Sequence, residues 1–179
     1  MPFFNSLLKR LVDESDELRK FLSAQAQLSL LRAAEDNSRK ALVLSAASLF
    51  EHRIIEAILS YADKASSSDG CVTSLIRNKA VKRQFHTFFD WDNKKPGTFF
   101  TLLGDELGGK LKADCAISPG KGQVDAFLEV GRLRNCLVHQ NYAEFFLDKS
   151  ADDIRQLCEN ADRFVDQVEA LLALPRTYA

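Results

Sequence analysis

The chain has 179 residues, of which 46% are hydrophobic, and its formal net charge is only −1. This length suits one domain with a full core, so we predict a single domain over residues 1–179. The near-neutral charge excludes a global attraction to nucleic acid or to acidic membranes, so any nucleic-acid site has to be a local patch. Glycine (8) and proline (4) are scarce, which favours helices over sheets.

The first third of the chain predicts two long helices. Over residues 5–32, leucines and a phenylalanine recur near helical spacing with charged residues between them. Asn37 or Ser38 is the predicted N-cap of a second helix that runs to about Lys64. The middle of this second helix is apolar almost all round, which is typical of the central helix of a bundle.

The segment from Cys71 to about Gly120 has a less regular pattern. It predicts short helices and turns, with the last short helix stopped by Gly108 and Gly109. Its aromatic residues predict part of a subunit interface: Phe85, Phe88, Phe89, Trp91, Phe99 and Phe100. Its basic residues fit either a solvated face or a track for an RNA backbone: Lys79, Lys82, Arg83, Lys94 and Lys95.

The last third predicts two further helices. One begins at Gln123, and the other follows Ser150, a good N-cap with acidic residues in the first turn. No repeat or hairpin signal interrupts the pattern. The predicted fold class is therefore an all-α bundle with two long N-terminal helices, an irregular middle and two C-terminal helices.

The four cysteines are scattered, with no C-x-x-C and no histidine at zinc-finger spacing. This spacing predicts neither a zinc site nor any other bound cofactor. No apolar run reaches the length of a membrane span, and the N-terminus turns acidic too soon for a signal peptide. We therefore expect a reduced, cytoplasmic protein with no membrane partner.

The stretch "RLRNCLVHQNY", residues 132–142, places strongly polar groups inside an apolar helical run. Arg134 follows the apolar side of the helix, where a buried guanidinium keeps its charge and needs an acceptor. Glu51, in the apolar second helix, is the candidate acceptor, so a structural ion pair is one interpretation. His139 near the helix end fits either a satisfied structural histidine or a proton-transfer group. His52 and His86 are most simply structural, in a buried helix and in an aromatic cluster.

Arg134, Asn135 and His139 form the string "RN-x-LVH" late in an amphipathic helix. In this motif and in its helical setting the chain resembles the HEPN superfamily, which is marked by R-x4-6-H. The segment "SAASLFEHRIIEAIL" is similar to the second helix of the RiboL-PSP-HEPN group. The resemblance implies a HEPN-like helical bundle and a metal-independent endoribonuclease that acts as a homodimer, often as a toxin or defence effector with an antitoxin or other partner.

The resemblance implies that Arg134 and His139 are catalytic and that Asn135 assists. Glu51, the candidate acceptor in the second helix, is expected to position Arg134. Histidine transfers protons near neutral pH, and arginine stabilises charge on the phosphorane. A two-fold dimer would bring two copies of each to one scissile phosphate. The candidate RNA contacts are Tyr142, Arg132, Lys82 and Arg83. Some HEPN proteins carry a modified tyrosine two residues after the histidine, whereas here Tyr142 comes one residue later, so it fits packing or base stacking instead.

Two alternatives remain open from the sequence. One is a non-catalytic HEPN-like module that dimerises and binds a nucleotide or RNA. The other is a purely structural helical adaptor, in which Arg134 and Glu51 form a buried pair and His139 is simply exposed.

Overall fold

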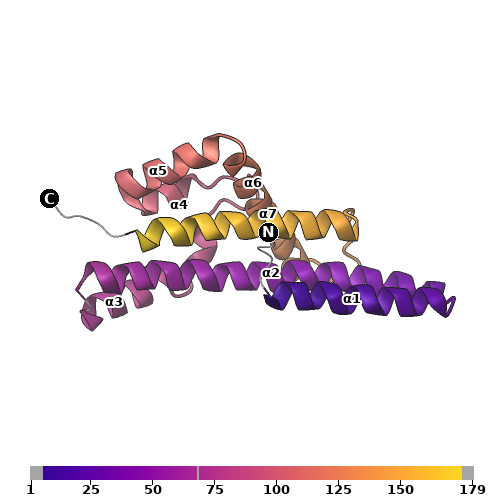
Figure 1. Ribbon diagram of the computed structural model, residues 1–179. Helices are drawn as coiled ribbons and strands as arrows, with labels where there is room; N and C mark the ends of the chain where they lie inside the picture. Colours follow the sequence, from indigo (N-terminus) through magenta and orange to yellow (C-terminus); the bar gives the residue numbers. More distant parts are fainter. Residues whose placement is uncertain (1–5, 68, 175–179) are drawn as a thin grey trace.

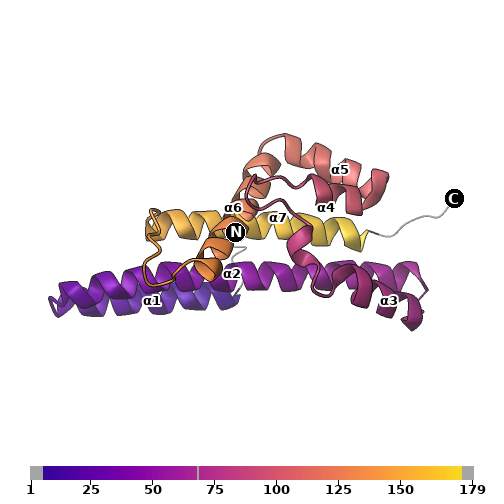
Figure 2. The same ribbon diagram turned by 180° about the vertical axis from the view of Figure 1, so that it is seen from behind.

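The computed structural model describes residues 6–67 and 69–174 and is helical throughout apart from turns and loops. Two long helices, α2 (Leu28–Ala65) and α7 (Ala151–Ala173), lie side by side along the molecule (Figure 1). Helix α1 (Ser6–Ala24) packs along the first half of α2, and α6 (Gly120–His139) crosses both long helices steeply (Figure 2). The predicted all-α class is confirmed, and the described residues contain no strand beyond one isolated bridge between Asp90 and Lys95.

The first two helices divide at a different place from the predicted one. The chain turns at residues 25–27, where Ala26 takes a left-handed φ of 53°, and α2 begins at Leu28. The predicted cap at Asn37 or Ser38 is therefore wrong, because both residues lie inside α2. The turn carries neither glycine nor proline, so no residue in the sequence marks it. It folds α1 back on α2, which buries Leu8 and Leu22.

The predicted central helix is confirmed in α2. Val43, Ala46, Phe50 and Ile54 recur every three or four residues and are at most 1% exposed. This stripe faces α6 and α7, which are the other two helices of the core. A single apolar cluster, drawn from α1, α2, the middle segment, α6 and α7, forms the core of the described chain.

The middle segment is built from short elements around an aromatic core. Helix α3 spans Gly70–Ile76, a π-turn Arg77–Val81 follows it, and a 3-10 turn covers Phe85–Thr87. Helices α4 (Gly97–Leu102) and α5 (Gly104–Ala116) then lie beside the end of α7 in Figures 1 and 2.

The predicted helix stop at Gly108 and Gly109 is wrong, since both lie within α5. The helices break at Gly104, whose φ of 77° suits glycine. Gly108 serves a different purpose: a Cβ atom there would lie 1.8 Å from the carbonyl oxygen of Phe100. The glycine therefore allows α4 and α5 to touch.

The aromatic residues of the middle segment lie in the core and not on a subunit interface. Phe85, Phe88, Phe89, Phe99 and Phe100 are each at most 8% exposed, and the rings of the first four contact one another. Trp91 is partly buried against the same cluster. The interface prediction for these rings was wrong because they pack into the chain's own core, where Phe89 and Trp91 contact the ring of Phe127 in α6.

Helix α7 begins as predicted, at a capping box in which Ser150 and Asp153 exchange hydrogen bonds. Helix α6 begins at Gly120, three residues before the predicted Gln123. Within the described ranges, no helix combines the length and apolarity needed to cross a lipid bilayer.

Two cations of α2 hold the loop that follows the motif helix. Lys40 is 2% exposed, and its ammonium donates to the carbonyl oxygen of Tyr142 (3.0 Å) and pairs with Asp36 (2.7 Å). Arg39 donates to the carbonyl oxygens of Leu147 (3.2 Å) and Lys149 (2.6 Å). The path of the chain just after His139 is thus fixed to α2.

Candidate active site

The end of α6 opens onto a pocket of about 540 Å³. Gly131, Asn135 and His139 follow one another at intervals of four residues, so they share one face of the helix, and Arg134 lies beside Asn135. All four line the pocket. A volume of this size lies within the range of small-molecule sites.

The other walls of the pocket come from distant parts of the chain. Helix α2 contributes Glu51 and the ring of Phe50, and the segment between α3 and α4 contributes Arg83, His86 and Trp91. The lining combines aromatic and aliphatic side chains with polar and charged ones. The pocket therefore pairs apolar surface with cationic and titratable groups.

Arg134 is half-buried, and its guanidinium donates to Oδ1 of Asn135 at 3.1 Å. Among the described residues, no ion pair or hydrogen bond joins Arg134 to Glu51, so the expected structural pair is not formed. Both residues nonetheless line the same pocket. The ion pair that does join α2 to a neighbouring helix belongs to Arg53, two residues later.

Arg53 reaches across to α7 and meets three carboxylates. Its Nη1 lies 2.5 Å from Asp162, and its Nη2 lies 2.6 Å from Asp166 and 2.5 Å from Glu169. Burial by itself would lower the pKa of Arg53, but the hydrogen bonds to Glu169 and Asp166 raise it further above its already high value. Arg53 thus forms the ionic link in this bundle that the sequence analysis assigned to Arg134.

His139 is the last residue of α6 and is exposed. In the part of the chain that the structure describes, no recorded hydrogen bond or ion pair occupies its imidazole. Its imidazole lines the pocket and is accessible to a molecule bound there.

Three of the candidate RNA contacts lie elsewhere. Arg132 is bound by Glu129, and Lys82 is exposed but is not part of the pocket lining. The ring of Tyr142 lies 5.0 Å from the Lys40 ammonium, a cation–π contact that favours the packing interpretation. Arg83 alone of the four joins the motif residues at the pocket.

Glu129 and Arg132 lie three residues apart on α6 and form an ion pair. Glu129 is 8% exposed and binds Arg132 (2.9 Å) and Lys94 (2.6 Å). Burial of this carboxyl raises its pKa, but the hydrogen bonds from Arg132 and Lys94 outweigh that effect and lower the pKa to about 2. Lys94 is therefore engaged in the fold and not free for an RNA track.

We expect the Glu129 cluster to stabilise the fold in a pH-dependent way. The folded pKa is about 2 against an ordinary value of 4.5, so the stabilisation is present above pH 4.5 and is lost as the pH falls toward 2. Glu129→Gln should lower the free energy of unfolding at pH 7 by roughly 1–3 kcal/mol. Urea unfolding from pH 7 to pH 3 should show this difference shrinking, and a difference independent of pH would contradict the assignment.

The structure adds His86, which the sequence predicts to be a structural residue in an aromatic cluster. His86 is exposed and lines the pocket, whereas Phe85 and Phe88 nearby in the chain are buried. The position of His86 depends on how its loop packs against the rest of the fold, and no local sequence pattern predicts that packing. His52, by contrast, is exposed on α2 and lines a different pocket, beside Arg53 and Glu56.

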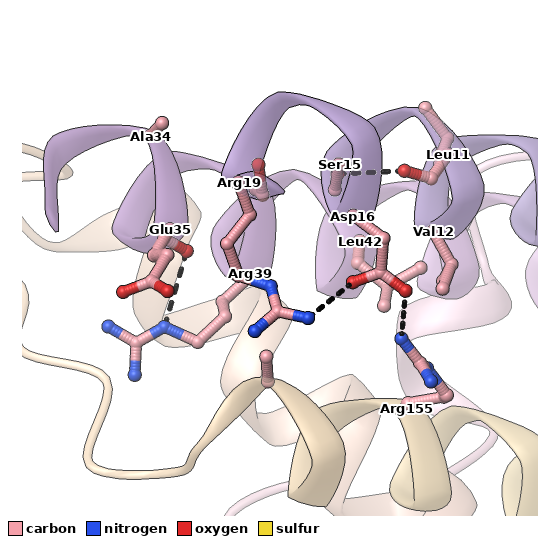
Figure 3. Close-up of a pocket in the computed structure, with 12 residues that line it drawn as sticks. Leu11, Val12, Ser15, Asp16, Arg19, Ala34, Glu35, Arg39, Leu42 and Arg155 are labelled. Carbon is pink, nitrogen blue, oxygen red and sulfur yellow. Dashed lines mark hydrogen bonds and ion pairs between the residues drawn. The ribbon is translucent and has the colours of Figure 1, made fainter. Parts of the chain in front are cut away.

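A separate small pocket lies where α1, α2 and the start of α7 meet (Figure 3). Asp16 stands between Arg155 (2.9 Å) and Arg19 (3.6 Å), and Ser15 donates to the carbonyl oxygen of Leu11. The cavity measures about 50 Å³, which is too small for a nucleotide. The pair of Asp16 with Arg155 joins α1 to α7 and supports the fold.

The arrangement of the helices and the motif agrees with one known family. A family model described as RiboL-PSP-HEPN matches residues 9–173. The chain belongs to the RiboL-PSP-HEPN family. The match runs from α1 to α7, so the HEPN assignment covers every helix of the structure and confirms the resemblance seen in the motif.

HEPN domains are helical, and the family is generally associated with ribonuclease activity. A search of curated proteins and a search of solved structures each found no match. For this HEPN protein, the roles of individual residues therefore rest on the pocket and its chemistry.

Proposed function

We propose that this HEPN protein is a metal-independent endoribonuclease. The observation that carries the proposal is the pocket where Arg134, Asn135 and His139 of α6 meet Arg83 and His86 of the middle segment. RNA brings its own nucleophile, the 2′-OH. Cleavage then needs one group to take the hydroxyl proton, another to protonate the leaving 5′-oxygen, and positive charge on the phosphorane.

The pocket residues match these needs. Arg134 is half-buried at the wall and supplies a guanidinium that binds two phosphate oxygens. His139 is exposed at the pocket and supplies a proton-transfer group, and Asn135, which already binds Arg134, orients the guanidinium. Glu51 faces the same space from α2 and is the candidate that positions Arg134 once substrate is bound.

The approach to the pocket is locally basic. Lys79 and Lys82 are exposed on the segment that leads to Arg83, which is itself exposed at the pocket. Such a row suits the backbone of a single strand, while Trp91 in the wall offers a ring for base stacking. The overall charge of −1 makes this row a local feature.

We also propose that two copies pair with their motifs facing one cleft, which makes a composite site with two sets of Arg134 and His139. Exposed apolar side chains lie within the motif and just after it: Val138 is 52% exposed and Phe146 is 80% exposed. Burial of these side chains between two copies would stabilise a dimer at that position.

Phe146→Asp should therefore convert the dimer into a monomer, because it places charge at an apolar contact. Light scattering at micromolar concentration gives the mass directly. Phe21→Asp, which alters another exposed ring, 62% exposed on α1, is the matched control and should remain dimeric. A wild-type protein that is monomeric in this measurement would rule out the composite site.

The biological setting is part of the proposal. Ribonucleases of this kind act as toxins or defence effectors, and an antitoxin or other defence-system partner would restrain them. The free thiols of Cys71, Cys115, Cys136 and Cys158 fit a reduced, cytoplasmic protein. The family match and the common core favour one HEPN domain over the whole chain.

The direct test is cleavage of a labelled single-stranded RNA by purified protein in EDTA. We expect cleavage to persist and the products to end in 2′,3′-cyclic phosphate and 5′-hydroxyl groups. DNA of the same sequence should resist, because it lacks the 2′-OH. RNA that is bound but not cut would favour the non-catalytic module, and cleavage that requires added metal or leaves 3′-hydroxyl ends would refute the mechanism.

A further inference from the structure

The chain has three histidines, and two of them line the same pocket. His86 and His139 are both exposed there, although 53 residues separate them in the sequence. His52 lines a different pocket, beside Arg53, Glu56 and Ser60. One protomer therefore already holds two imidazoles at the motif.

His86 is held by a rigid aromatic support. It lies in the 3-10 turn Phe85–Thr87, and Phe85 beside it is 8% exposed. The indole nitrogen of Trp91 donates to the carbonyl oxygen of His86 at 3.0 Å. Its backbone is thus fixed from two sides while its imidazole stays exposed.

The same tryptophan connects His86 to the motif helix. The Trp91 ring lies against Gly131, where a Cβ atom would be 2.0 Å from the ring. Gly131 lies one helical turn before Arg134 and Asn135 and shares their pocket. A bare α-carbon at this position lets the His86 segment dock directly on α6, so the two histidines keep a defined relation.

Arg83 adds a second guanidinium at the pocket. It is exposed and takes a left-handed φ of 63°, which non-glycine residues adopt rarely. In the described part of the chain, no recorded ion pair occupies its guanidinium. The segment 83–86 thus presents one arginine and one histidine to the pocket, as α6 does with Arg134 and His139.

We propose that His86 is the second proton-transfer group of the site and works with His139 of the same protomer, with Arg83 as a second phosphate ligand. This inference rests on the proposed ribonuclease function. In the dimer, each protomer would hold a complete acid–base pair of its own. The second copy would add further contacts to the RNA.

The chemistry balances with two histidines and no added reagent. One imidazole is neutral and takes the proton of the 2′-OH as the bond from O2′ to phosphorus forms. The other is protonated and gives its proton to the 5′-oxygen as the bond from phosphorus to O5′ breaks. Exchange with water then restores both histidines.

The pH dependence follows from this pair. The titratable and charged groups that face the pocket are Glu51 of α2, Arg83 and His86 of the middle segment, and Arg134 and His139 of α6. The mechanism needs one neutral and one protonated histidine. The value of kcat/KM should therefore show a bell-shaped dependence on pH.

The test compares His86→Ala with His52→Ala in RNA cleavage from pH 5 to pH 9. His86→Ala should lose about 100-fold or more in kcat/KM and one limb of the bell. His52→Ala should keep both the rate and the bell. His86→Asn, which is closer in size, should behave like His86→Ala, and thermal unfolding should show that both variants are folded.

The outcomes separate the two proposals. Wild-type protein that does not cleave RNA refutes the ribonuclease and this inference with it. If His139→Ala is inactive while a folded His86→Ala keeps full activity and the bell, the ribonuclease stands and the role of His86 is wrong.

Mixed dimers give a second, independent test. A dimer of one wild-type and one His139→Ala protomer should keep about half of the activity, because one protomer still holds His86 and His139 together. A dimer of one His86→Ala and one His139→Ala protomer should be inactive. Near-complete loss in the first mixed dimer, or recovery in the second, would show that the pair forms between protomers and overturn the inference.

Discussion

Arg134→Ala and His139→Ala should each lower the rate of RNA cleavage by about 100-fold or more, the scale expected when a charge stabiliser or a proton-transfer group is lost. The effect should appear in kcat more than in KM, because both groups act on charge and protons that develop in the transition state. Initial rates on one labelled RNA under saturating and limiting conditions would separate the two constants.

The loss should not come from unfolding. His139 is exposed at the end of α6, and the recorded hydrogen bond of the Arg134 side chain is the one to the neighbouring Asn135. Thermal unfolding of both variants should therefore match that of the wild type within a few degrees. Arg163→Ala, which removes an exposed arginine of α7 outside the pocket lining, is the matched control and should cleave normally. Full activity without His139 would exclude the proposed mechanism.

Arg53→Ala should lower the free energy of unfolding by about 3–5 kcal/mol, because it leaves a buried carboxylate without its cation. The Asp162 side chain is 2% exposed and lies 2.5 Å from Arg53, whereas Asp166 and Glu169 remain partly solvated. Urea unfolding at pH 7 measures the change.

A double variant tests the reason for that loss. Arg53→Ala combined with Asp162→Ala removes both charges, so it should be less unstable than the sum of the two single variants. Arg10→Ala breaks an exposed pair with Glu14 on α1 (3.5 Å) and should cost about 1 kcal/mol or less. If Arg53→Ala and Arg10→Ala lower the free energy of unfolding by similar amounts, the ion pairs of Arg53 with α7 do not stabilise the bundle as predicted.

Much of the fold could be predicted from local patterns. The helical periodicity of α2, the capping box of Ser150 and the amphipathic α7 act within a few turns of one helix, so the sequence predicts them directly. The same holds for the motif, because Asn135 and His139 are four residues apart and must share a face of α6.

Helix boundaries that no glycine or proline marks could not be predicted from the sequence. The turn at Ala26 has no glycine or proline, and it forms because α1 gains a core by folding back on α2. Gly108 looked like a stop signal, yet it continues α5 and permits contact with Phe100. In both cases packing against another helix outweighs the local preference of the chain.

The sequence by itself predicted the helical class, the resemblance to the family and the motif of Arg134, Asn135 and His139, because helical periodicity and the motif spacing act within single helices. Only the tertiary structure decided which charges pair across helices and which side chains meet at the pocket. It gave the ionic link to Arg53 and not to Arg134, and it placed His86 opposite the motif through the contact of Trp91 with Gly131. The physical reason is that such contacts depend on how segments distant in the sequence pack together. That packing is set by the shape of the whole core, and the spacing of residues along the chain does not predict it.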